Sequence, residues 1–189
     1  MNALAHYVIT GCWLLFVVYW IISALRVKPV AERQSEPDSA GHRLLVLLGG
    51  LLLWWPGLVP GLNWAIYDRP GALRLLAAAI CVGGLGVAFW ARRTLAGNWS
   101  SNVTFKVGHE LIRTGPYRWV RHPIYTAILL MALGTAMISG RLGSWLGLVL
   151  MTAGFWIKLK AEESLMLRHF PDTYPGYQKQ VKALVPFLF

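Results

Sequence analysis

The sequence predicts an all-α integral membrane protein with five transmembrane helices and a C-terminal amphipathic segment, in one domain over residues 1–189. Apolar residues make up 56% of the 189 residues and charged residues only 14%, against about 45–50% and about 25% in typical proteins. Five apolar runs account for this excess, and the basic residues lie mainly between alternate runs. These numbers exclude a soluble domain and intrinsic disorder.

The first three expected spans cover residues 4–25, 44–67 and 72–90. Each is long enough to cross a hydrocarbon core about 30 Å thick. Residues 26–43 hold turn-forming and charged residues, so we expect a loop there. Two prolines and two glycines lie in the second half of the second span, and that half must kink or unwind. Arg92 and Arg93 are expected to end the third span.

The last two expected spans, residues 124–139 and 142–157, form a hairpin. Pro123 suits the first helical position of the fourth span, where its missing N–H costs nothing. A stripe of Gly143, Gly147 and Gly154 lies on one face of the fifth span. Small residues at this spacing let membrane helices approach closely. Three prolines in residues 158–189 exclude one continuous helix there.

The basic residues predict the orientation in the membrane. Residues 26–43, 91–122 and 158–189 contain 15 of the 18 lysines and arginines. The positive-inside rule therefore places the C-terminus in the cytoplasm and the N-terminus outside. Topology and attraction to membrane lipids explain the net charge of +10, so nucleic acid is not an expected partner. We expect an inner (plasma) membrane of bacterial type, with the active site facing the cytoplasm.

Polar residues gather in residues 98–125 and 158–177, which the hairpin brings to one membrane face. The first segment offers cations and aromatic rings, and the second offers Glu162 and Glu163. Adjacent carboxylates at the end of a membrane helix are costly unless cations pair with them, and such groups are candidate functional residues. A purely structural alternative is a pair of helix-end carboxylates bound to Arg113 or Lys160.

Residues 115–125 read GPYRWVRHPIY, and after the hairpin come the two glutamates and the pattern F-x3-Y-x2-Y-x3-V-x4-P. This combination resembles the isoprenylcysteine carboxyl methyltransferase family, which is related to the phospholipid N-methyltransferases. The resemblance covers residues 94–189, the expected catalytic half. It implies methyl transfer from S-adenosylmethionine to a lipophilic acceptor that enters from the bilayer, with an isoprenoid or lipid carboxylate as the favoured acceptor.

The resemblance also implies which residues bind the cofactor. They are Asn102, His109, Glu110, Leu111, Ile112, Tyr117, His122, Pro123, Ile124, Tyr125 and Glu162. The family's arginine for the substrate carboxylate falls on Lys158, and lysine keeps the charge without the bidentate fork. Ala127 stands where the family often has glycine.

The residue chemistry is consistent with this implied reaction. Glu162 can accept a hydrogen bond from the ammonium group of the cofactor, and the aromatic rings can face its sulfonium. A carboxylate acceptor needs only a cation to place it, from Lys158 or Arg121. An amine acceptor must first lose a proton, for which Glu163 or His122 is the candidate base.

Other functions stay open from the sequence alone. The acceptor can be a phospholipid amine or a small thiol, and an NADPH-dependent membrane reductase of the sterol type has similar helices. A non-catalytic membrane subunit or carrier is a further alternative, although a carrier places its charged groups near the midplane, not at the ends of spans. No metal site is expected, because His6, His42 and His169 lack ligand spacing.

Overall fold

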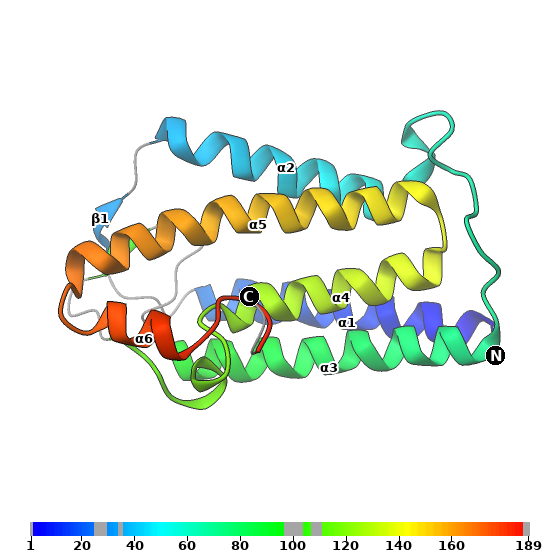
Figure 1. Cartoon of the computed structure of the whole chain (residues 1–189). Helices are drawn as coiled ribbons and strands as arrows, with labels where there is room; N and C mark the ends of the chain where they lie inside the picture. The colour runs from blue at the N-terminus through cyan, green and yellow to red at the C-terminus, as the bar shows by residue number, and fades with distance from the viewer. Residues whose placement is uncertain (1, 25–29, 34–35, 97–103, 107–110, 187–189) are drawn as a thin grey trace.

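The computed structural model describes residues 2–24, 30–33, 36–96, 104–106 and 111–186. The main helices in these residues are α1 (Asn2–Ala24), α2 (Glu36–Trp54), α3 (Gly71–Leu95), α4 (Pro123–Ser139) and α5 (Leu142–His169), with a short α6 (Tyr174–Gln180) near the C-terminus (Figure 1). The shorter elements are the 3-10 helices η1 (Pro56–Leu58) and η3 (Gly115–Arg118) and the antiparallel strands β1 (Val30–Arg33) and β2 (Thr104–Lys106). The all-helical prediction is therefore confirmed except for this strand pair.

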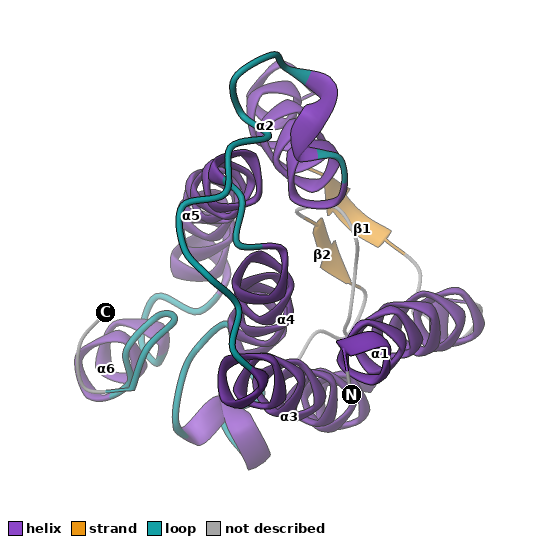
Figure 2. Ribbon diagram, turned by 90° about the vertical axis from the view of Figure 1, so that its right-hand side faces the viewer, coloured by secondary structure: helices purple, strands orange, loops and turns teal. Residues whose placement is uncertain are grey.

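Helix α4 lies at the centre of the arrangement. It packs against α3 on one side and α5 on the other, while α1 packs on α3 and α2 packs on α5 (Figure 2). The five helices thus form a curved row in the order α2, α5, α4, α3 and α1, and α1 also contacts α4. Because α4 and α5 run antiparallel across a tight turn, the start of α4 and the C-terminal part of α5 lie at the same end of the molecule (Figure 1).

Within the part of the chain that the structure describes, three helices are long and apolar enough to cross a membrane: Leu4–Ala24 of α1, α3 and α5. The apolar part of α2, Ala40–Trp54, and helix α4 are shorter. Large side chains such as Leu14, Ile21, Leu47 and Val149 are exposed on the outer faces of the helices. Exposed apolar surface of this extent is characteristic of contact with lipid, which supports the prediction of an integral membrane protein.

The second half of the expected second span, residues 44–67, unwinds as predicted, because α2 ends at Trp54. The prolines of this half have no backbone N–H and cannot continue a helix. The chain instead forms η1 and then runs irregularly to α3. The N–H of Ile66 donates to the Gly140 carbonyl at 3.0 Å, and the N–H of Gly143 donates to the Leu62 carbonyl at 2.7 Å. Neighbouring protein therefore satisfies part of the unwound backbone, as a membrane requires.

Three further boundaries differ from expectation. α2 begins at Glu36, inside the expected loop 26–43. α3 continues past Arg92 to Leu95. The guanidinium of Arg92 is buried there and donates hydrogen bonds to the carbonyls of Ser23 at 2.7 Å and Ala96 at 2.6 Å. α5 continues past residue 157 to His169, since residues 158–169 contain neither proline nor glycine. Both glutamates consequently belong to the same helix as the glycine stripe.

Glycines set the closest helix contacts, as the stripe on the fifth span predicts. A Cβ atom added to Gly147 would lie 2.5 Å from the carbonyl oxygen of Gly49, and one on Gly154 would lie 2.9 Å from that of His42. The contact between α3 and α4 has the same character, because a Cβ on Gly134 would lie 2.5 Å from the Ala77 oxygen. These contacts fix the spacing of α5 against α2 and of α4 against α3.

Neighbouring glycines of α2 test this packing. A Cβ on Gly49 would meet the Gly147 oxygen at 2.6 Å and the Met151 nitrogen at 2.8 Å, whereas a Cβ on Gly50 meets nothing within 4 Å. We predict that Gly49→Ala lowers the free energy of unfolding by about 1–3 kcal/mol, the usual cost of overpacking. Gly50→Ala should be neutral or stabilising, because alanine favours a helix. Thermal unfolding of the detergent-solubilised variants measures both changes in stability. Equal changes in the two variants would contradict the close contact of Gly49 with α5.

Candidate active site

Most residues that the sequence singles out come together where α4 begins and the C-terminal half of α5 passes it. Tyr117 lies in η3 and is buried, and Pro123, Ile124 and Tyr125 form the buried first turn of α4. Leu111 and Ile112 are half-buried, and Ile112 packs against the cluster that contains Tyr117 and Tyr125. Asn102, His109 and Glu110 lie outside the described residues.

The segment before α4 is held by the C-terminal part of the chain. The N–H of Arg121 donates to the Lys182 carbonyl at 2.8 Å, and the N–H of His122 donates to the Ala183 carbonyl at 3.0 Å. The hydroxyl of Thr126 donates to the Leu184 carbonyl at 2.7 Å. Pro123 is the first residue of α4, as predicted. The start of α4 is therefore fixed both by proline and by backbone bonds to residues 182–184.

A buried ion pair connects this segment to α5. The Nε and Nη2 atoms of Arg121 lie 2.8 and 2.6 Å from Oε1 of Glu163. Nη1 of the same guanidinium donates to the carbonyls of Gln178 and Val181. The second carboxylate oxygen of Glu163 accepts a hydrogen bond of 3.1 Å from the Gln178 amide. Both charges are thus satisfied by protein groups, which is the condition for burying an ion pair.

His122 lies between the two glutamates. Its Nε2 is 3.2 Å from Oε1 of Glu163, and its Nδ1 is 3.5 Å from Oε2 of Glu162. Burial alone would lower the pKa of His122, but the hydrogen bonds to Glu162 and Glu163 outweigh it and raise the pKa above the ordinary value of 6.5. The protonated imidazolium is therefore the form that this position favours.

Glu162 has a different environment from its neighbour. Its side chain is 24% exposed, compared with 6% for Glu163. Its Oε1 accepts a hydrogen bond of 2.5 Å from the hydroxyl of Tyr125. Lys158, one helical turn earlier on α5, lies close enough to act electrostatically on this carboxylate, and its Nζ is 5.3 Å from the centre of the Tyr125 ring. Glu162 is consequently the more accessible carboxylate, with a cation and an aromatic ring beside it.

Three contributions to the site were not among the predicted site residues. Phe155 stacks on Tyr125 with ring centres 4.9 Å apart, Gln178 binds Glu163, and the hydroxyl of Tyr177 donates to the Tyr117 carbonyl at 2.6 Å. Tyr177 belongs to the C-terminal pattern noted in the sequence, which was the available signal. Glu163 pairs with Arg121 and His122, whereas the structural alternative expected Arg113 or Lys160 as the partner of the glutamates. The ammonium group of Lys160 instead lies over the Trp156 ring, 5.0 Å from its centre.

Comparisons with known proteins identify a family and several relatives of this chain. The family model described as phospholipid methyltransferase matches residues 73–173. A protein-S-isoprenylcysteine O-methyltransferase of Schizosaccharomyces pombe is 35% identical over 81 residues, which is 42% of this chain and 34% of that protein. The enzyme of the same name from Tribolium castaneum is 34% identical over 84 residues, 42% of this chain and 29% of that protein. The matched region thus spans about a third of the length of these relatives.

The contacts of His122 predict a dependence of stability on pH. Because folding raises the pKa of His122, the stabilisation from its protonated form is complete below pH 6.5 and is lost as the pH rises through the raised pKa. We predict that the midpoint of thermal unfolding of the wild-type chain decreases as the pH rises from 6.5 through the raised pKa of His122. His122→Gln should show a smaller decrease, and an unchanged pH profile in this variant would contradict the assigned contacts.

Proposed function

The chain belongs to the phospholipid methyltransferase family, and on that premise we propose that it transfers a methyl group from S-adenosylmethionine to a lipophilic acceptor. The names of its relatives support methyl transfer. They favour it over the sterol-type reductase and over a non-catalytic carrier. The charge distribution supports a site at the cytoplasmic face, with the N-terminus outside.

The difference between the two adjacent glutamates is the observation on which this proposal rests. Glu163 is buried and its oxygens bind Arg121, His122 and Gln178, whereas Glu162 is more exposed and has the Tyr125 hydroxyl as its close donor. A partly exposed carboxylate in an aromatic environment fits the ammonium group of the cofactor. We assign Glu162 to cofactor binding, together with the segment 109–112 and the first turn of α4.

The sequence predicts that Arg121 and Glu163 act on the acceptor directly. Their mutual contacts favour another role, because each already has its hydrogen-bonding groups directed at protein partners. We propose that both are positioning residues. They hold the start of α4 against α5, and this contact places Tyr125 beside Glu162.

S-adenosylmethionine supplies a methyl group that its sulfonium already activates, so the protein has mainly to orient the donor and the acceptor. Lys158 lies one turn before Glu162 on α5 and provides a cation that can hold an acceptor carboxylate next to the cofactor site. The ring of Tyr125 lies close to both this cation and the imidazole of His122. Stacking on Phe155 keeps that ring in place.

The environment of His122 favours a carboxylate acceptor over an amine. An amine must lose a proton before it attacks, and a base for this step has to be unprotonated. The raised pKa of His122 favours its protonated form, and Glu163 already accepts hydrogen bonds from Arg121 and Gln178. A carboxylate acceptor needs no base, and Lys158 is sufficient to position it. We therefore propose an isoprenoid or lipid carboxylate as the substrate.

Matched substitutions of the two glutamates test the cofactor assignment. Glu162→Gln should abolish S-adenosylmethionine binding in calorimetric titration while the variant stays folded, with a smaller loss of stability than in Glu163→Gln. Glu163→Gln should lower the free energy of unfolding strongly, because removal of one partner of a buried ion pair costs about 3–5 kcal/mol. Retained cofactor binding in a folded Glu162→Gln variant would contradict the assignment.

Lys158 and Lys160 provide a second matched pair. Lys158→Ala should leave cofactor affinity unchanged and decrease turnover at least tenfold, since a misplaced acceptor loses much of the orientation effect. Lys158→Arg should retain turnover because the charge is kept. Lys160→Ala, which removes an exposed cation beside Trp156, serves as the control. Transfer of labelled methyl to an S-isoprenylcysteine with a free carboxylate measures these effects, and weakened cofactor binding in Lys158→Ala would reassign this residue to the cofactor.

A further inference from the structure

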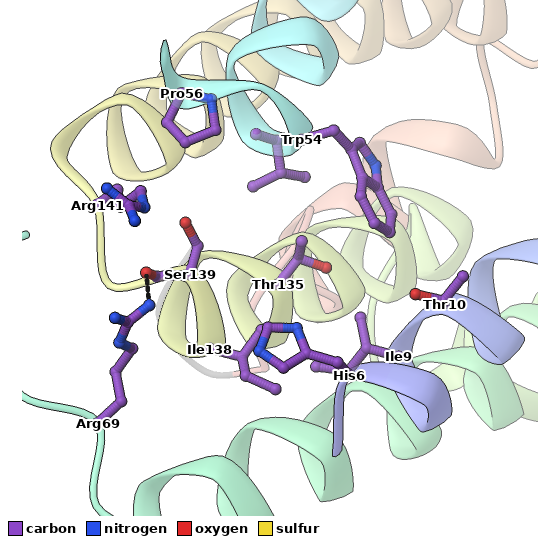
Figure 3. Close-up of a pocket in the computed structure, with 11 residues that line it drawn as sticks. His6, Ile9, Thr10, Trp54, Pro56, Arg69, Thr135, Ile138, Ser139 and Arg141 are labelled. Carbon is purple, nitrogen blue, oxygen red and sulfur yellow. Dashed lines mark hydrogen bonds between the residues drawn. The ribbon is translucent and has the colours of Figure 1, made fainter. Parts of the chain in front are cut away.

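A cavity of about 310 Å³ lies at the end of the helices opposite the candidate active site (Figure 3). Its walls come from the first turns of α1, from the end of α2 with η1, and from the last turns of α4. α4 has 17 residues and is therefore about 25 Å long, so the cavity and the start of α4 are separated by nearly the thickness of a hydrocarbon core. The two sites are distinct.

Apolar residues and two arginines make up most of the cavity lining, which also includes the polar residues His6, Thr10 and Thr135. Ile9, Leu53, Trp54 and Ile138 give it apolar walls. Arg69 and Arg141 come from the loop before α3 and from the turn between α4 and α5, and they lie on the same side of the cavity, beside Ser139 (Figure 3). A mostly apolar cavity with two cations on one side suits an amphiphilic ligand, because its acyl chain needs apolar surroundings and its headgroup needs polar ones.

Backbone carbonyl groups orient the two guanidiniums at the cavity. Nη1 of Arg69 donates to the Ser139 carbonyl at 2.8 Å, and Nη1 of Arg141 donates to the Asn63 carbonyl at 2.6 Å. Carbonyl groups orient an arginine without neutralising it, and an arginine has further N–H donors in a fork that suits phosphate. Among the described residues that line the cavity, none is acidic.

We propose that this cavity binds one anionic phospholipid, with its phosphate at Arg69 and Arg141 and the upper part of an acyl chain between α1 and α2 on the face of α4. A soluble anion would leave the apolar walls without contacts, and an uncharged lipid would offer no negative charge to the two guanidiniums. The ammonium group of a zwitterionic lipid would meet no carboxylate in the lining. The site is independent of the proposed methyl transfer, which takes place at the other end of the helices.

Native mass spectrometry of the detergent-purified chain tests the proposal. Phosphatidylglycerol and phosphatidylcholine with identical acyl chains are added separately, and the occupancy of the first bound lipid is compared. We expect one tightly retained phosphatidylglycerol per chain. Arg69→Gln and Arg141→Gln should each reduce its preference over phosphatidylcholine about fivefold, the effect of roughly 1 kcal/mol for a basic residue near anionic lipid.

Two control variants separate a specific site from general attraction. Arg74→Gln removes a charge at the same end from a residue that does not line the cavity, and its amide can keep the hydrogen bond of Arg74 to the Arg69 carbonyl. This variant should retain the preference. Thr10 lines the cavity but is exposed, so Thr10→Phe should displace the lipid without repacking the core. Equal retention of the two lipids by the wild type, or equal losses in Arg74→Gln and Arg141→Gln, would overturn the proposal.

Discussion

The buried ion pair between Arg121 and Glu163 is the contact on which the rest of the candidate site depends. It joins the residues just before α4 to the C-terminal half of α5, and the same guanidinium binds carbonyls of residues 178 and 181. A buried charge that loses its partner is strongly destabilising. Three segments that are distant in the sequence are therefore held in one arrangement, and the side chains around Tyr125 take their positions from it.

This pair also explains why two adjacent glutamates have different environments. Successive helical residues point about 100° apart, so Glu163 faces Arg121 and the C-terminal segment while Glu162 faces Tyr125 and Lys158. The first carboxylate has a structural role in our account, and the second is left for a ligand. In our proposal this ligand is S-adenosylmethionine, as family membership suggests, and the acceptor is a carboxylate, which needs no base before it attacks.

The sequence predicts those features that depend on local patterns. Pro123 indicates where α4 begins, the glycine stripe indicates the face of α5 that contacts α2, and the basic and acidic segments flanking the hairpin indicate which end contains the site. It does not predict which glutamate Arg121 binds, because that depends on helix rotation and on backbone hydrogen bonds to residues 182–184. Helix ends were also missed where a tertiary contact decides them. Arg92 lies within α3, where its guanidinium donates to the carbonyls of Ser23 and Ala96.

Calorimetric titration of the folded, detergent-solubilised chain with S-adenosylmethionine, and separately with NADPH, tests the central claim most directly. Our account predicts saturable binding of S-adenosylmethionine alone, at one site per chain. Binding of NADPH alone would place the chain with the membrane reductases. Binding of neither compound by the folded chain would show that it shares the family fold without the methyl-transfer site.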